Sequence, residues 1–300
     1  ALSYLANADI LLATGTGDLG RESLFEAKQI ADKHPDYKLR LDVNSMLGNL
    51  FHQQGQIEES LKYLEVCRKI TLKYGDSSET CFLLNNMGVL QSEMGNNQKS
   101  VETLKQALAL AESLGELFTQ GMCRNNLGGS LGNLKRYDEA INELSISLQL
   151  FQEIGDPAWE ALTLAKLARV IMDADSGNKQ KTLDYALRAL HLGDSLEQKD
   201  IQRRALRVLH MAYEAQGRYQ EAYDSYQRYE KIRSELRGEE RKISTLQREA
   251  KYEFEKQLAL ERSKSEQKVA LAEANESKQE AIAWAFIIGC ILLLAFIVLI

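Results

Sequence analysis

The sequence contains little proline and few aromatic residues: two of its 300 residues are proline, and Phe, Trp and Tyr together make up 7%. It also lacks any convincing run of alternating apolar and polar residues, the pattern typical of a half-buried strand. Leu, Ala, Glu, Lys and Gln, which suit helices, are abundant instead. The sequence therefore predicts an all-α chain.

Positive charge is not in excess, because 37 Lys and Arg stand against 43 Asp and Glu, a net charge of −6. This balance gives no indication of a surface for nucleic acid. The four cysteines show no metal-ligand spacing, and Cys67, Cys81 and Cys123 occupy core-like helical positions, which favours buried thiols over a disulfide. We expect no metal, no cofactor and no nucleic-acid partner.

Catalytic constellations are also missing from the sequence. Each of the four histidines stands without a Cys, Ser or carboxylate partner at a motif spacing. Residues 15–20 match the glycine pattern of a dinucleotide-binding loop, but no strand follows them, and they fall in a turn of the first repeat described below. We therefore expect that this chain is not an enzyme.

A short glycine-containing phrase returns every 40 residues, at 47–49 (Leu-Gly-Asn), 86–88 (Asn-Met-Gly) and 126–128 (Asn-Leu-Gly). Self-similarity at this period predicts a solenoid of stacked helix pairs. Both prolines, Pro35 and Pro157, fall at repeat boundaries. The expected repeats lie near 1–35, 36–76, 77–116, 117–156, 157–197 and 198–235.

Residue size within the repeat has a physical reason. Small residues such as Gly88 let the two helices of a pair approach closely, and large apolar residues fill the gaps between layers. The residues expected to fill gaps are Leu64, Leu104, Leu144 and Tyr226. The glycines expected to end helices in a left-handed conformation are Gly75, Gly115, Gly155 and Gly193.

This pattern resembles the tetratricopeptide-repeat family, in its 40-residue variant with a Leu-Gly-Asn-like phrase. The resemblance covers roughly residues 1–235 and implies an all-α solenoid of about six helix-turn-helix repeats. It also implies that the first helix of each repeat lines a concave groove that holds a peptide or protein segment. Because one fold hosts many functions, the resemblance does not identify the ligand.

Residues spaced by three, four and seven share one side of each first helix and are therefore candidates to line the groove. Asparagine offers both a donor and an acceptor to an extended peptide backbone, and Arg and Lys would capture a carboxylate. Two alternatives stay open: the asparagines pack between helix pairs, or the basic residues form a solvated face. The candidate binding residues are Asn49, Asn85, Asn86, Asn125, Asn126, Lys166, Arg169, Arg204 and Arg207.

Residues 236–280 read as a charged helical stalk. Apolar residues keep a seven-residue spacing at Leu236, Ile243 and Ala250, but Gln257 and Lys264 break it. We interpret the segment as a coiled-coil stalk through which two copies pair as a homodimer. The alternative is a single solvated helix.

Residues 281–300 carry no charge. Twenty helical residues span about 30 Å, the thickness of the hydrocarbon core of a bilayer, and Trp284 lies where an interfacial aromatic is favoured. The sequence predicts a transmembrane helix here, with a buried soluble helix as the alternative. Charges in the residues before this segment are balanced, which permits a periplasmic position for the repeats.

The stretch 251–257 (KYEFEKQ), followed by charged helix and one span, resembles the connector of bacterial membrane sensors that carry tetratricopeptide repeats. The resemblance implies the sensor part of a single-pass inner-membrane protein whose output domain, commonly a histidine kinase of a two-component system, follows residue 300. Because the chain opens on Ala1 and stops at Ile300, we expect it to be a piece of such a protein. The alternatives are a membrane-anchored scaffold, or the sensor part of a phosphatase, cyclase or transcription regulator.

Overall fold

The computed structural model describes residues 17–174 and 179–239, together with positions 241, 242, 245, 256, 278 and 289. The described residues form helices and turns and no strand, which confirms the all-α prediction. The helices are α2 (Gly17–Lys33), α3 (Tyr37–Gln53), α4 (Ile57–Tyr74), α5 (Ser77–Glu93), α6 (Asn97–Leu114), α7 (Leu117–Asn133), α8 (Tyr137–Ile154), α9 (Pro157–Asp173), α10 (Lys179–Ser195) and α11 (Lys199–Glu214), followed by a helical segment at 219–239.

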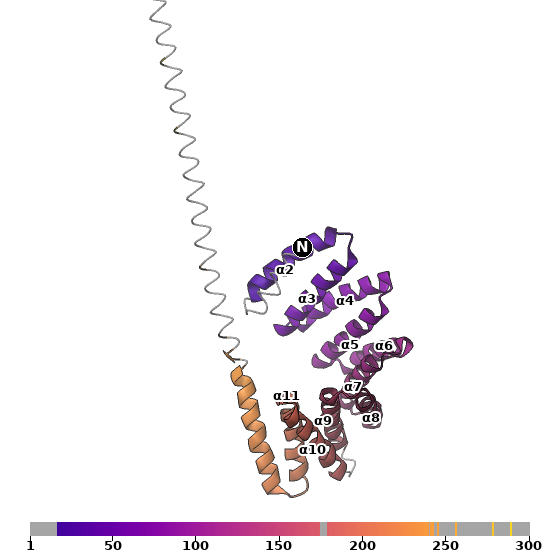
Figure 1. Cartoon of the computed structure of the whole chain (residues 1–300), viewed down its shortest axis with the longest axis vertical. Coiled ribbons are helices and arrows are strands. Elements are labelled where there is room, and N and C mark those ends of the chain that lie inside the picture. Colours follow the sequence, from indigo (N-terminus) through magenta and orange to yellow (C-terminus); the bar gives the residue numbers. More distant parts are fainter. Residues whose placement is uncertain are drawn as a thin grey trace, which may run out of the picture.

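The helices pack in sequential pairs, and the pairs stack on one another. Within the pairs, α3 contacts α4, α5 contacts α6, α7 contacts α8, and α9 contacts α10. The first helices also contact each other in series, since α5 packs on α7, α7 on α9, and α9 on α11. Figure 1 shows the resulting curved stack, which runs from α2 to the orange helix at 219–239. This is the predicted solenoid.

Close packing inside each pair explains the glycine of the repeated phrase. A Cβ atom added to Gly88 would lie 2.5 Å from Leu104 Cγ, and one added to Gly128 would lie 2.5 Å from Leu144 Cγ. Both leucines are fully buried, as the sequence predicts. Tyr226 differs from the prediction because its side chain is 43% exposed. It lies on the last helix of the described stack, where no further helix pair covers it.

The turns between pairs confirm three of the four predicted helix ends. Gly75, Gly115 and Gly155 have left-handed backbones with φ of 74°, 69° and 76°. The prediction for Gly193 is wrong, because this residue lies inside α10, where an added Cβ would come within 2.9 Å of Ile201 Cγ2. The missing side chain of Gly193 allows close packing against α11. Glu197 takes the left-handed conformation instead, with φ of 53°.

In the described part of the chain, the buried apolar residues form one large cluster and two small ones. The large cluster extends from Cys81 on α5 to Ile232 on the last helix. The small clusters join α2 to α3, and α3 to α4 and α5. Cys67, Cys81 and Cys123 are buried free thiols, as predicted.

No helix within the described part of the chain is long and apolar enough to cross a membrane. The predicted transmembrane helix at 281–300 lies outside the described residues, apart from position 289, and so does most of the predicted stalk at 236–280. The helix at 219–239 passes residue 235 without a break. The end of the last predicted repeat and the start of the predicted stalk are therefore one helix.

Candidate functional site

The inner wall of the solenoid, formed by α5, α7, α9 and α11, carries two neighbouring cavities. The smaller, of about 200 Å³, lies between α9 and α11. Its lining residues are Ala165, Lys166, Arg169, Arg203, Arg204, Arg207 and Val208. The larger, of about 400 Å³, extends to α5. Its lining residues are Val89, Ser92, Glu93, Asn125, Asn126, Gly129, Ser130, Asn133, Trp159, Leu162, Lys166, Arg169 and Arg204.

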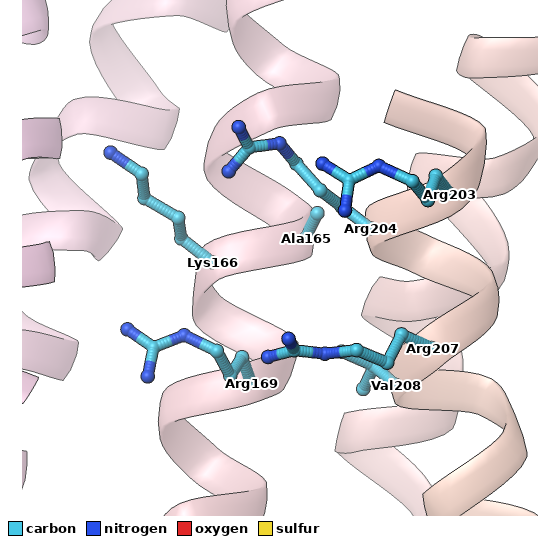
Figure 2. A pocket seen from close by; sticks show the side chains of 7 residues that line it. All are labelled: Ala165, Lys166, Arg169, Arg203, Arg204, Arg207 and Val208. Carbon is cyan, nitrogen blue, oxygen red and sulfur yellow. The ribbon is translucent and has the colours of Figure 1, made fainter. Parts of the chain in front are cut away.

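Helical spacing brings the cationic side chains of the smaller cavity together. Lys166 and Arg169 lie about one turn apart on α9. On α11, Arg203 and Arg204 both lie about one turn before Arg207. Figure 2 shows Arg207 reaching from α11 toward α9, level with Arg169. We call these five residues the basic cluster.

Only part of this positive charge is paired. Arg169 donates to Asp173 at 3.0 Å, and Asp200 accepts from both Arg203 and Arg204 at 2.5 Å. Although partial burial raises the pKa of Asp200, the hydrogen bonds from its two arginines leave that pKa below its usual value.

The two remaining members of the basic cluster are not paired with an acid. Within the described residues, Lys166 and Arg207 have no carboxylate within ion-pair distance. The cluster therefore holds more positive charge than its neighbouring carboxylates neutralise.

Lys166 is half-buried and is held by neutral oxygens of α7. Its Nζ donates to Asn126 Oδ1 at 3.2 Å, to the Asn125 main-chain oxygen at 3.3 Å, and also to Asn125 Oδ1. Burial lowers the pKa of Lys166 to about 7, and the positive charges of Arg204 and Arg169 add to this effect. The amine therefore changes its charge near neutral pH.

The asparagines of α5 and α7 form a chain of amides across the inner wall. Asn126 Nδ2 donates to Asn85 Oδ1 at 3.0 Å, and Asn125 Nδ2 donates to Thr163 Oγ1 at 2.7 Å. Asn85 and Asn125 are buried, and their amides join neighbouring helix pairs, as in the packing alternative above. That they also contact a ligand stays a prediction.

The structure brings most of the predicted binding residues together. Asn125, Asn126, Lys166, Arg169, Arg204 and Arg207 line the two cavities, and Asn85 is bonded to Asn126. Asn86 is exposed beside Asn85 on α5 and lines neither cavity. Asn49 is exposed on α3 and also lines neither.

Several lining residues were not predicted from the sequence, among them Arg203, Trp159 and Gly129. Arg203 had a signal, because it lies four residues before Arg207 and so shares a helix face with it. Trp159 stacks on Phe151 with ring centroids 5.2 Å apart, and nothing in the repeat pattern places it at the groove. Gly129 leaves room for Lys166, whose Nζ would lie 3.7 Å from an added Cβ.

Comparison with known proteins supports the fold. A tetratricopeptide-repeat family model matches residues 39–113, and a second matches residues 205–236. No curated protein sequence matches the chain.

Solved structures of low identity share the solenoid. BtubC (BKLC) from P. vanneervenii has a TM-score of 0.62 at 18% identity, covering 74% of this chain and 91% of its own. RapI in its apo form has a TM-score of 0.62 at 14% identity, covering 79% and 98%. A Rap protein complexed with competence and sporulation factor has a TM-score of 0.55 at 14% identity, covering 78% and 75%. The chain thus carries tetratricopeptide repeats, and its helices form a solenoid of that type.

Proposed function

We propose that the inner wall binds an extended protein or peptide segment and that the basic cluster holds an acidic group of this ligand. The observation that carries the proposal is a cavity whose basic side chains outnumber the carboxylates that pair with them, since Lys166 and Arg207 have no acidic partner among the described residues. Charge-assisted hydrogen bonds to a carboxylate are about twice as strong as neutral ones. An acidic ligand would therefore gain most of its polar binding energy at this end of the groove.

The larger cavity provides the rest of the groove. It shares Lys166, Arg169 and Arg204 with the smaller cavity, so the two are continuous. Asn126, Asn133 and Ser92 present amide and hydroxyl groups that suit the backbone of an extended segment, and Trp159 adds an apolar surface. Tetratricopeptide-repeat solenoids serve as scaffolds for protein interaction, and the Rap neighbour complexed with competence and sporulation factor supports the same role here.

Two pools of fluorescein-labelled octapeptides, otherwise randomised, test this function. One pool carries Glu-Asp-Glu at its centre, and the other carries Gln-Asn-Gln. Fluorescence anisotropy should show that the acidic pool binds at least about tenfold more tightly, since a hydrogen bond between charged groups contributes about 1.5–3 kcal/mol. Equal binding of the two pools would contradict the proposal.

Variants locate the site. The double variant Arg169→Ala, Arg207→Ala should remove the preference for the acidic pool, whereas Asn126→Ala should weaken both pools alike. Arg136→Ala is the matched control, because Arg136 pairs with Glu139 at the start of α8 and lines neither cavity. If the double variant keeps the acidic preference, the basic cluster is not the anchor.

We further propose that this module is the sensor of a single-pass protein of the bacterial inner membrane, with its repeats in the periplasm. The uncharged stretch 281–300 and the connector-like stretch 251–257 support this, together with a terminal helix that passes residue 235 unbroken. Ligand binding would then change the solenoid curvature or the pairing of two stalks. It could do so only by its difference in affinity for two arrangements. The proposed output is a histidine kinase.

The reading frame beyond the codon for Ile300 tests this second proposal. We expect it to enter a basic helix and then a signalling domain whose motifs name the output. A stop codon within a few residues would contradict the sensor and favour the tail-anchored scaffold. Protease added to spheroplasts should cut the repeats if they are periplasmic, whereas protection until lysis would place them in the cytoplasm.

A further inference from the structure

We propose that the smaller cavity is a site for a doubly charged acidic group and that binding of this group favours the protonated form of Lys166. This inference rests on the proposed function, because it specifies the acidic group that the basic cluster holds. It adds that ligand binding is accompanied by uptake of a proton.

The balance of fixed charge matches a dianion. Four guanidinium groups line the cavity, from Arg169, Arg203, Arg204 and Arg207. They face two carboxylates, those of Asp173 and Asp200. With Lys166 neutral, the cluster therefore has a surplus of two positive charges among the described residues. A phosphate monoester or a pair of adjacent carboxylates supplies the two negative charges that neutralise it.

The size of the cavity fits the same class of group. A volume of about 200 Å³ corresponds to roughly six or seven water molecules at about 30 Å³ each. A phosphate or a short dicarboxylate therefore fits within such a space. The guanidinium groups provide several N–H donors in planar forks that suit these oxygens, and Ala165 and Val208 close the cavity with apolar surface.

Lys166 is placed so that an anion would change its protonation. Its three acceptors are the neutral oxygens of Asn125 and Asn126 on α7, which offer no negative charge. The charges of Arg204 on α11 and Arg169 on α9 act on it, and Arg203 and Arg207 of α11 line the same cavity. Residues of α8 and α10, which pack elsewhere on α9, line neither cavity in the described part of the chain. The one carboxylate that lines the larger cavity, Glu93, pairs with His52 at 2.9 Å.

A dianion bound in the cavity would reverse the effect of these surroundings on the pKa of Lys166. Burial and the charges of Arg204 and Arg169 hold the pKa of Lys166 at about 7 in the free protein. A dianion seated between Lys166 and these arginines would offset their charge and favour the ammonium form, so the pKa of Lys166 would rise on binding. Above pH 7 the free amine is mostly neutral, so binding takes up a proton; well below pH 7 it is already protonated, so no uptake occurs.

Titration calorimetry with sulfate and succinate tests the inference, because both remain dianions at about pH 7–9. Heats measured at about pH 8 in Tris and in HEPES, at constant ionic strength, should differ by an amount that corresponds to uptake of close to one proton. The affinity should fall by up to about tenfold for each pH unit above 7, since one linked proton gives that slope. Acetate, a monoanion of similar chemistry, should bind at least about tenfold more weakly.

Variants separate Lys166 from the other cations. Lys166→Met should bind the dianion more weakly at about pH 6 and should lose both the proton uptake and the pH dependence. Lys179→Met is the matched control, because Lys179 donates to the Ala215 main-chain oxygen at 3.0 Å and does not line the cavity. This control should behave like the unaltered chain. If Lys166→Met is unstable, the heats of the unaltered chain in the two buffers still test whether binding is linked to proton uptake.

Each result decides something. Binding of sulfate alone identifies a phosphate-like group, and binding of succinate alone identifies paired carboxylates; either one supports the inference when proton uptake accompanies it. Binding without a difference between buffers overturns the role of Lys166. If neither dianion binds while the acidic octapeptide pool does, the dianion site is wrong and the proposed function stands. If the acidic pool also fails, both are wrong.

Discussion

The turn between the two helices of a pair places one residue in the left-handed region of the backbone. Gly55, Gly95 and Gly217 occupy this position with φ of 72°, 80° and 73°. Lys135 occupies it in the third complete pair, with φ of 60°. A residue with a Cβ atom adopts this conformation at a cost of about 1–2 kcal/mol, which glycine avoids.

Replacing this lysine should therefore stabilise the protein. Lys135→Gly should raise the free energy of unfolding in urea by about 0.5–1 kcal/mol, because the relief of strain exceeds the greater backbone entropy of glycine in the unfolded chain. Gly95→Lys, the reverse change at the equivalent turn, should lower it by a similar amount. If Lys135→Gly destabilises the chain, the lysine side chain makes contributions that outweigh the strain.

The sequence predicted the roles of residues packed inside a helix pair better than the burial of polar residues on the inner wall. Gly88 and Gly128 could be recognised because each lacks a side chain where a buried leucine must fit. Asn85 and Asn86 are adjacent in sequence, yet one is buried and bonded across helix pairs while the other is exposed. This difference depends on the rotation of α5 relative to α7, which a single repeat does not encode.

At the scale of elements, the 3.6-residue period of a helix predicted which basic residues share one face. An N-cap residue marks where α9 begins. Asp156 accepts hydrogen bonds from the backbone N–H groups of Ala158 and Trp159, both at 3.0 Å, and Pro157 follows it at the start of α9. The register of α9 is thereby set, and Lys166 and Arg169 fall on its inner side. These features are local, so they could be predicted from sequence.

Contacts between elements were harder to predict. Gly129 lines the larger cavity because its missing side chain leaves space for Lys166 of the next pair, and a single repeat does not encode that contact. Gly193 shows the same limit, since its role is set by the approach of Ile201 on α11. Periodicity fixes which face of a helix is apolar, but not how two such faces meet.

At the scale of the whole molecule, the core is divided unequally. The large apolar cluster joins α5 to the last helix, and it includes residues of α7, α9 and α11. The N-terminal pairs rely on two small clusters. In a solenoid each repeat is stabilised by its own packing and by its immediate neighbours, so unequal clusters imply unequal local stability. The basic cluster lies on the better-packed part, which keeps its side chains preorganised for a ligand.

Native-state amide exchange should reveal this division. Amides of α2–α4 should exchange with a lower opening free energy than those of α7–α9, because fewer buried contacts must be broken to open them. Leu47 and Leu127 occupy equivalent positions in the small and the large cluster and are 0% and 1% exposed. Either Leu→Ala change should remove about 2–5 kcal/mol locally.

The two variants should differ in how far the loss spreads. Leu47→Ala should speed exchange in α2–α4 and leave α7–α9 protected, so binding of an acidic ligand should persist. Leu127→Ala should speed exchange throughout α5–α11 and weaken binding, since α7 holds Lys166 through its amides. If both variants raised exchange uniformly along the chain, the solenoid would open as one cooperative unit. The rigidity of the site would then depend on every repeat rather than on the large cluster alone.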